Sequence, residues 1–316
     1  IRRQRQMCIR DRAVGLDPGL NDGHWKIANK CNPGVPVFSS ETYPGWLRHW
    51  GEGNWNPTPE IVDHVRWFMD KGRSFSLFVF HGGTNFGFTA GANNGGPGQY
   101  QPDLTSYDYG SPVDEHGRMN EYYTRMREII LAKLPAEAAV PEPPADIPSM
   151  EIPEFTPEVH AGLWENLPRP FRSKFPQPPY FEQWNQNQGM AIYSTAVPAG
   201  PSETLELSSA SDYAQVYLNG ELIGTLDRRL GQKSLVLPER KKPGTLEILV
   251  EAMGHINFHI SMESDRKGLH GAVKLGPREL KGWTVRALPL TALPSLRLPK
   301  GRDRPRIGQE PISGPF

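Results

Sequence analysis

The chain has 316 residues, enough for two domains, and its 35 basic residues balance its 35 acidic ones. Zero net charge, without a basic stripe interleaved with aromatics, argues against nucleic acid or an anionic membrane as a partner. The two cysteines, Cys8 and Cys31, are too few for a disulfide framework or a metal site, and the longest apolar run, at 75–80, cannot span a bilayer. We therefore expect no cofactor, no metal and no membrane span.

The first twelve residues are basic and lack any periodicity. They show no signal-peptide pattern and predict a tail that is foreign to the fold or disordered. Residues 13–36 are rich in Gly, Asn and Pro, and we expect a loop-rich lead into the first clear strand.

That strand lies in VPVFSSETYPGWLRHW, residues 35–50, where an apolar, β-prone run ends at Glu41. Barrel enzymes place catalytic groups at the carboxyl ends of their strands. Aromatic rings follow closely and are suited to contacting a sugar ring, namely Tyr43, Trp46 and Trp50. The alternative is that Glu41 is solvated or paired with Arg48, as most surface acids are.

A helix and a second strand follow. Thr58 as N-cap and Pro59 at the first helical position predict a helix whose apolar face spans 61–69. The nearly continuous apolar run Phe75–His81 then predicts a buried strand parallel to the first. GANNGGPG, residues 91–98, lacks the Lys-Ser/Thr of a phosphate-binding loop and predicts a flexible loop. A further helix is expected at Asn120–Leu131.

The composition changes after this helix. Residues 136–179 are rich in Pro and predict an extended linker. From 180 to 295, short alternating strands with a two-residue turn at Asn219-Gly220 predict an all-β sandwich or jelly roll. Residues 296–316 are basic and Pro-rich, and we expect them to be disordered.

Three strings resemble glycoside hydrolase family 35, the β-galactosidases: SSETYPGWLRHWG at 39–51, HGGTNF at 81–86 and SYDY at 106–109. The resemblance implies an exo-acting, retaining β-galactosidase with Glu41 as nucleophile. It also implies that the sugar contacts Tyr43, Trp46 and Tyr109, while Phe88 stands where many members have a tyrosine.

The same resemblance implies the architecture and the setting. Residues 13–135 would form the C-terminal part of a (β/α)8 TIM barrel, and residues 180–295 a jelly-roll β-sandwich domain. The implied partner is a β-galactoside or oligosaccharide, and the family favours an extracytoplasmic location. The alternatives are an exo-β-glucosaminidase or another β-glycosidase of the family, and a non-catalytic carbohydrate-binding module that uses exposed Trp184 or Trp283.

A retaining glycosidase needs a second carboxyl group as acid/base. In the family this is a Glu in an Asn-Glu pair ahead of the nucleophile, and no Asn-Glu precedes Glu41 in this chain. Asp17 and Asp22 lie in a Gly/Asn/Pro segment typical of turns, and Glu121 opens a helix, where acids are common. We therefore expect the chain alone to be inactive.

Other motifs favour structural roles. The HGGT string at 81–84 resembles an esterase oxyanion loop, but the chain has no G-x-S-x-G. His255 and His259 fall in a strand pattern, which favours packing over metal ligation. Asp108, Asp114 and Glu115 are expected to cap loops, with Asp108 able to orient Tyr109.

Overall fold

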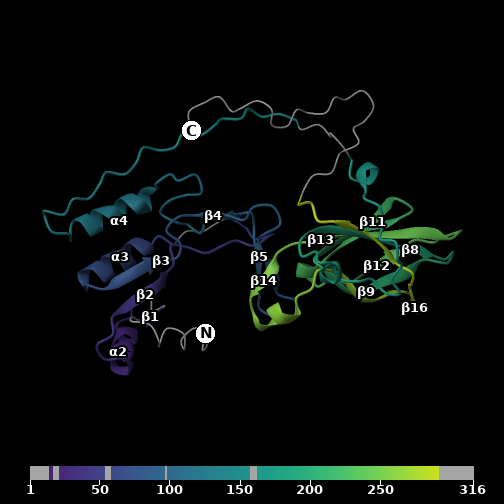
Figure 1. The fold of residues 1–316 in the computed structure, drawn as a ribbon, viewed down its shortest axis with the longest axis horizontal. Coiled ribbons are helices and arrows are strands. Elements are labelled where there is room, and N and C mark those ends of the chain that lie inside the picture. Colours follow the sequence, from purple (N-terminus) through teal and green to yellow (C-terminus); the bar gives the residue numbers. More distant parts are fainter. Residues whose placement is uncertain (1–13, 17–20, 54–57, 97, 157–161, 292–316) are drawn as a thin grey trace. The chain divides into compact units, whose positions relative to one another are not determined.

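The computed structural model describes residues 14–16, 21–53, 58–96, 98–156 and 162–291 (Figure 1). The expected tails at 1–12 and 296–316, together with Cys8 and Asp17, lie outside these residues. The chain divides into two compact units, residues 1–90 with 101–150 and residues 91–100 with 151–316. No helix among the described residues is long and apolar enough to cross a membrane.

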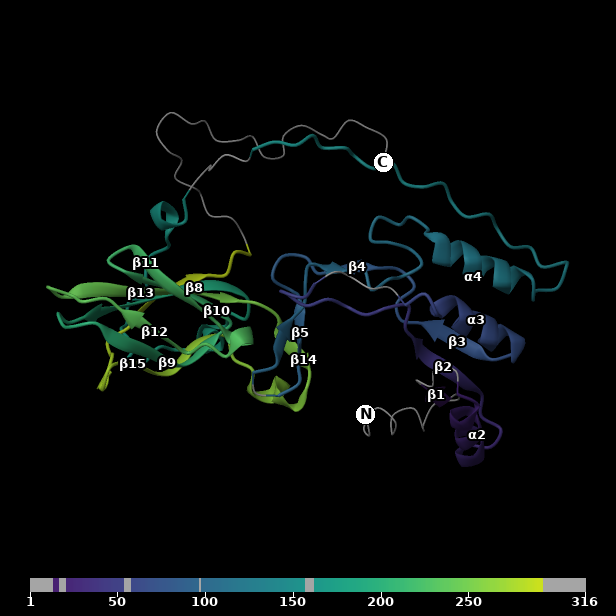
Figure 2. The same ribbon diagram turned by 180° about the vertical axis from the view of Figure 1, so that it is seen from behind.

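The first unit is built on a parallel sheet, as predicted. Its strand order is β1 (Val14–Leu16), β2 (Val37–Thr42), β3 (Ser74–Leu77). Two helices, α3 (Ile61–Asp70) and α4 (Glu121–Leu131), lie side by side and share one apolar cluster, which includes the partly buried Phe75 and Leu77 of β3 (Figures 1 and 2). A short antiparallel pair, β4 (Gly83–Thr84) and β7 (Ser106–Tyr107), completes the ordered elements of this unit.

Local sequence explains the helix that links the first two strands. The lead at 13–36 is not only loop, because it contains β1 and the helix α2 (Asp22–Cys31). The side chain of Asn21 accepts a hydrogen bond from Gly23 N at 2.8 Å and so caps the first turn of α2. Trp25 and Ala28, three positions apart, form its buried face.

The predicted start of α3 was two residues early. The helix begins at Ile61, and Thr58 contributes only its backbone carbonyl, which accepts from Ile61 N at 3.1 Å. The apolar face was predicted correctly, since Ile61, Val62, Val65 and Phe68 are all buried.

The two predicted strands are less apolar and less buried than expected. In β2 the buried side chains are the polar Ser39 and Thr42, whose hydroxyls bond to each other at 2.8 Å. The second strand ends at Leu77 rather than His81, and Phe78 and Phe80 beyond it are exposed. An apolar run alone does not reveal where a strand leaves its sheet.

The core of the second unit lies between two β-sheets. One sheet has the order β11 (Glu221–Asp227), β10 (Tyr213–Leu218), β13 (Gly244–Ala252), β8 (Gly189–Val197), β17 (Thr284–Leu288), and the other β12 (Ser234–Leu237), β9 (Glu203–Ser211), β15 (Gly268–Leu275), β16 (Arg278–Glu279). They form two layers around one core (Figure 2). Asn219 and Gly220 turn with φ of 53° and 84°, which confirms the predicted hairpin.

Short 3-10 helices connect the strands of this unit: η1 (Trp164–Asn166), η2 (Phe181–Trp184), η3 (Arg228–Leu230) and η4 (Ile260–Ser264). Neither Trp184 nor Trp283 is exposed as the alternative of a carbohydrate-binding module requires. Trp283 is fully buried, and Trp184 is half-buried and packs against Phe171, Phe181 and Tyr193.

The segment at 91–98 contains a strand rather than only a flexible loop. β5 (Gly91–Asn94) pairs in parallel with β14 (His255–Phe258) (Figure 1). β6 (Tyr100–Pro102) lies on the other side of β5. Its register partner is far away in the sequence, so local composition gave no sign of the pairing.

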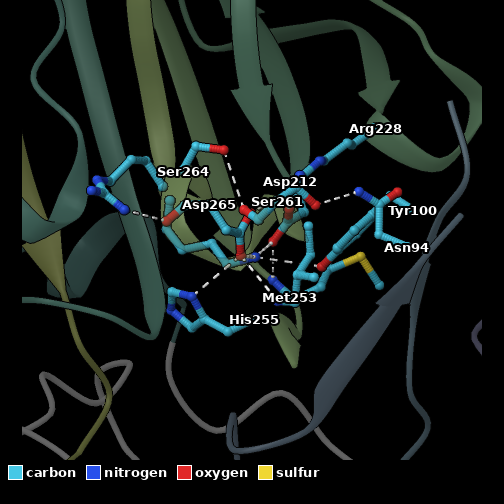
Figure 3. A network of polar contacts seen from close by, with 12 residues as sticks. Asn94, Tyr100, Asp212, Arg228, Met253, His255, Ser261, Ser264 and Asp265 are labelled. Atoms are coloured by element: carbon cyan, nitrogen blue, oxygen red, sulfur yellow. Dashed lines mark hydrogen bonds and ion pairs between the residues drawn. The ribbon is translucent and has the colours of Figure 1, made fainter. Parts of the chain in front are cut away.

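A buried network of charges contacts β14 and Tyr100 of β6 (Figure 3). The side chain of Lys267 is fully buried, and its Nζ donates to Asp212 Oδ2 at 2.6 Å and to the Gly254 carbonyl at 2.7 Å. Arg228 bridges Asp212 and Asp265 at 2.7 and 2.8 Å. Burial acts to raise the pKa of Asp265, but the bonds from His255 and the neighbouring cations hold it well below its usual range.

We predict that Lys267→Met destabilises the second unit by about 3–5 kcal/mol, because removing one partner leaves buried carboxylates uncompensated. Urea unfolding of the full chain measures this. Lys274→Met, an exposed lysine on β15, is the matched control and should change stability by less than about 0.5 kcal/mol. Equal effects of the two substitutions would contradict the prediction.

Candidate functional site

Glu41 lies near the carboxyl end of β2, as predicted. Its Oε2 accepts a hydrogen bond from the hydroxyl of Tyr43, two residues further along. The strand remains in the sheet to its end, since the Thr42 carbonyl accepts from Phe78 N at 2.9 Å. The sheet therefore fixes the backbone beside the carboxylate, and Tyr43 fixes the orientation of its side chain.

Tyr43 connects this carboxylate to a cluster of aromatic rings. Its ring centroid lies 5.7 Å from that of Trp46, 5.9 Å from that of Phe78 and 6.3 Å from that of Tyr109. Tyr109 is 2% exposed whereas Trp46 is 52% exposed, and their rings are 5.7 Å apart. Tyr109 therefore supports the cluster from within, and Trp46 presents a ring to solvent.

Two glycines allow the loops of this cluster to approach one another. A Cβ at Gly45 would overlap the carbonyl oxygen of Tyr109, and a Cβ at Gly82 would lie 3.0 Å from the Cα of Asp108. Tyr109 itself has φ of 63°, an uncommon backbone conformation for a tyrosine. The YPGW and HGGT strings are therefore required for close backbone packing as well as for their side chains.

A hollow of about 330 Å³ lies beside the aromatic cluster. It is lined by Trp46, Arg48, Ser106, Asp108, Tyr109 and Glu115. Glu41 is not among these lining residues and reaches the cluster through Tyr43. Sequence reasoning placed Trp46 and Tyr109 together correctly but assigned no site role to Arg48, Ser106 or Glu115.

The acids of the hollow also hold its loops, as expected for capping groups. Glu115 accepts hydrogen bonds from the hydroxyls of Thr84 on β4 and Ser106 on β7. Asp108 accepts from Gly110 N at 3.2 Å, and burial raises the pKa of its carboxyl. These side chains fix the loop that carries Tyr109.

A second set of cross-links holds the loop after Trp46. Trp50 N donates to the Pro102 carbonyl at 2.8 Å, and Leu104 N donates to the Arg48 carbonyl at 3.1 Å. Between these two bonds, the buried His49 places Nε2 3.6 Å from Asp103 Oδ1 and Nδ1 2.7 Å from Glu52 Oε1. Burial raises the pKa of Asp103 to about 6, partly offset by His49, while Glu52 raises it further.

The remaining predicted site residue is Phe88, and Asp22 and Glu121 are acids that the sequence analysis considered and set aside. Phe88 is half-buried in the turn after β4, and among the described residues no ring contact joins it to Tyr43 or Trp46. Asp22 forms ion pairs with Arg73 at 2.6 Å and Lys71 at 3.7 Å. Glu121 is the exposed first residue of α4.

The two histidines of the strand pattern have protein partners. His255 Nδ1 lies 3.3 Å from Asp265 Oδ2, and His259 caps η4 by accepting from Ser261 N. Among the described residues, no three His, Cys, Asp or Glu side chains gather as metal ligands would.

Comparison with known proteins gives two family matches. Residues 5–133 match the model for glycosyl hydrolases family 35, and residues 178–290 match that for the first all-beta domain of beta-galactosidase. Both matches agree with the division into an α/β part and an all-β part.

Individual relatives agree with these models. A beta-galactosidase from Xanthomonas manihotis is 34% identical over 287 residues, which is 90% of this chain and 47% of that protein. A beta-galactosidase from Homo sapiens is 34% identical over 265 residues, 81% of this chain and 38% of that protein. The beta-galactosidase-1-like protein 3 of Homo sapiens is 30% identical over 277 residues, which is 85% of this chain and 41% of that protein. The chain therefore spans less than half the length of these curated relatives.

We predict that Gly45→Ala disrupts the cluster, because the new methyl group collides with backbone rather than with a flexible side chain. The expected result is a shift in tryptophan emission and a loss of stability on the order of 1–3 kcal/mol. Gly53→Ala is the control, since nothing lies within 4 Å of a Cβ placed there. Equal responses of the two variants would refute the steric explanation.

The raised pKa of Asp103 has a consequence for stability against pH. The folded state holds the Asp103 proton more tightly than the unfolded chain does. The contribution of this proton to the stability of the fold is therefore complete below pH 3.8 and is lost as pH rises through about 6. Replacing the carboxylate by a neutral group should therefore increase stability more at neutral than at acid pH.

We expect the melting temperature of Asp103→Asn, relative to that of wild type, to increase from pH 4 to pH 7. Asp63→Asn, an exposed acid on α3, should show no such trend. A difference for Asp103→Asn that is constant with pH would contradict the burial of this charge.

Proposed function

Because residues 5–133 of this chain belong to glycosyl hydrolase family 35, we propose that it contributes the nucleophile and part of the sugar site of an exo-acting, retaining β-galactosidase. The observation that supports this most directly is the position of Glu41. Its carboxylate ends a parallel strand and is joined by Tyr43 to the Trp46–Tyr109 cluster.

The proposed architecture follows the same family. The first unit represents the C-terminal part of a (β/α)8 barrel over residues 13–135, with three parallel strands and their helices. Residues 136–179 form the linker, and the two-layered unit is a jelly roll over 180–295. An extracytoplasmic location belongs to the same proposal.

In the proposed reaction, a carboxylate oxygen of Glu41 attacks the anomeric carbon of a terminal β-galactosyl residue. The bond to the aglycone oxygen breaks, and a second carboxyl group protonates that oxygen as it leaves. The same group then removes a proton from water, which attacks the anomeric carbon and releases Glu41. The acid in this proposal comes from outside these 316 residues, so the chain alone is expected to lack turnover.

The neighbours of Glu41 have distinct proposed roles. Tyr43 orients the carboxylate through its hydroxyl, which donates to Glu41 Oε2. Trp46, half-exposed on the buried Tyr109, offers an apolar face on which a sugar ring can stack.

We predict that Glu41→Gln in the complete gene product lowers kcat/KM for an aryl β-galactoside on the order of a thousand-fold or more, since the amide cannot form the glycosyl ester. Glu128→Gln, an exposed glutamate on α4, is the matched control and should keep the wild-type rate. Full activity in Glu41→Gln would rule out the nucleophile assignment.

A second candidate is an exo-β-glucosaminidase or another β-glycosidase, favoured by Phe88 standing where many family members have a tyrosine. A phenylalanine cannot donate the hydrogen bond that a tyrosine hydroxyl would give to a sugar. Comparing wild type and Phe88→Tyr on galactosides and glucosaminides separates the two. A preference for galactosides that exceeds tenfold in wild type would reject this candidate.

A further inference from the structure

One short segment, residues 91–100, belongs to the second unit, although the residues before and after it belong to the first. We call this segment the excursion. The chain leaves the first unit after Ala90 and returns at Gln101. Within the excursion, β5 pairs with β14, and Ala92 and Tyr100 share a small buried cluster with Ile256. Asn94 Nδ2 also donates to Ser261 Oγ at 2.7 Å (Figure 3).

Tyr100 is buried and has several partners in the second unit. It is 4% exposed, and its hydroxyl donates to the Gly254 carbonyl at 2.5 Å. The guanidinium of Arg228 lies 4.2 Å from the ring centroid, and the ammonium of Lys267 lies 5.2 Å from it. We call Gly254, Arg228 and Lys267 the tyrosine socket.

The socket is rigid because its cations are themselves fixed. Lys267 donates to Asp212, and Arg228 bridges Asp212 and Asp265 (Figure 3). Every one of these charged side chains has partners of opposite sign, so moving one requires breaking buried ion pairs. A ring seated there gains both apolar burial and cation–π attraction.

The segment that follows Tyr100 holds the site loop. Pro102 accepts from Trp50 N, Asp103 faces His49, and Leu104 N donates to the Arg48 carbonyl. That loop begins at the Trp46 platform, and Arg48 lines the hollow. Only Gln101 separates the anchored ring from the first of these cross-links.

We propose that Tyr100 is a positioning residue: seated in the tyrosine socket, it fixes residues 102–104 and through them the loop of Trp46 and Arg48. This role rests on the proposed function only for its effect on sugar binding. The mechanical part, that the socket restrains the loop at 46–52, stands on the contacts described above.

Hydrogen exchange on the 316-residue chain tests the mechanical part. In Tyr100→Ala, amides at 91–100 and at 46–52 should both exchange at least about tenfold faster than in wild type, while those of β13 stay unchanged. Tyr100→Phe keeps the ring over Arg228 but loses the hydroxyl, and should give a smaller increase in the same two segments. Tyr217→Phe, a half-buried tyrosine whose hydroxyl donates to Gln215, is the control and should leave both segments unchanged.

Faster exchange confined to 91–100 in both variants would overturn the proposal, because the anchor would then be merely local. If β13 also exchanges faster in Tyr100→Ala, that variant has destabilised the whole second unit. The outcome is then decided by Tyr100→Phe alone, by whether exchange becomes faster at 46–52 as well as at 91–100.

Kinetics of the complete gene product test the consequence for the site. Tyr100→Phe should raise KM for a β-galactoside about threefold to tenfold with kcat within twofold, because a displaced platform weakens ground-state and transition-state binding alike. An unchanged KM would overturn this consequence. Absence of turnover in wild type would instead contradict the proposed function, and the exchange result would be unaffected.

Discussion

The site depends on one close approach of backbone to backbone, where Gly45 meets the carbonyl of Tyr109. A side chain at position 45 would push the two loops apart, because its first carbon would overlap the backbone carbonyl of Tyr109. With the glycine in place, Trp46 packs on Tyr109, and Tyr43 can reach both the aromatic cluster and the carboxylate of Glu41. The surroundings of Glu41 thus depend on the absence of a methyl group four residues away.

The two units use buried polar groups differently. In the second unit, Lys267 and Asp212 are fully buried and satisfied by each other and by backbone groups, which makes the network a fixed reference point. In the first unit, His49 and Asp103 face each other across 3.6 Å with a carboxyl pKa near 6, so their interaction changes with protonation. The interaction in the first unit therefore responds to pH.

Much of the fold could be predicted because its signals are local. The face of α3, the turn at Asn219-Gly220 and the position of Glu41 at a strand end all follow from periodicity or from turn chemistry within a few residues. The strand β5 could not be predicted, since Gly91–Asn94 is composed like a loop and becomes a strand only by pairing with residues beyond 250. Likewise, nothing near Glu115 indicates that its carboxylate joins Thr84 to Ser106.

The sheet of the first unit ends at β3, a strand that carries Phe75 and Leu77 and runs directly into the exposed Phe78 and Phe80. An edge strand has unpaired backbone donors and acceptors that can pair with a β-strand of another chain, and exposed hydrophobic residues beside it strengthen that association. We expect newly synthesised chains to pair with one another through this edge. Dilute, cool expression or a co-produced covering segment is therefore the sensible route to material that remains monodisperse.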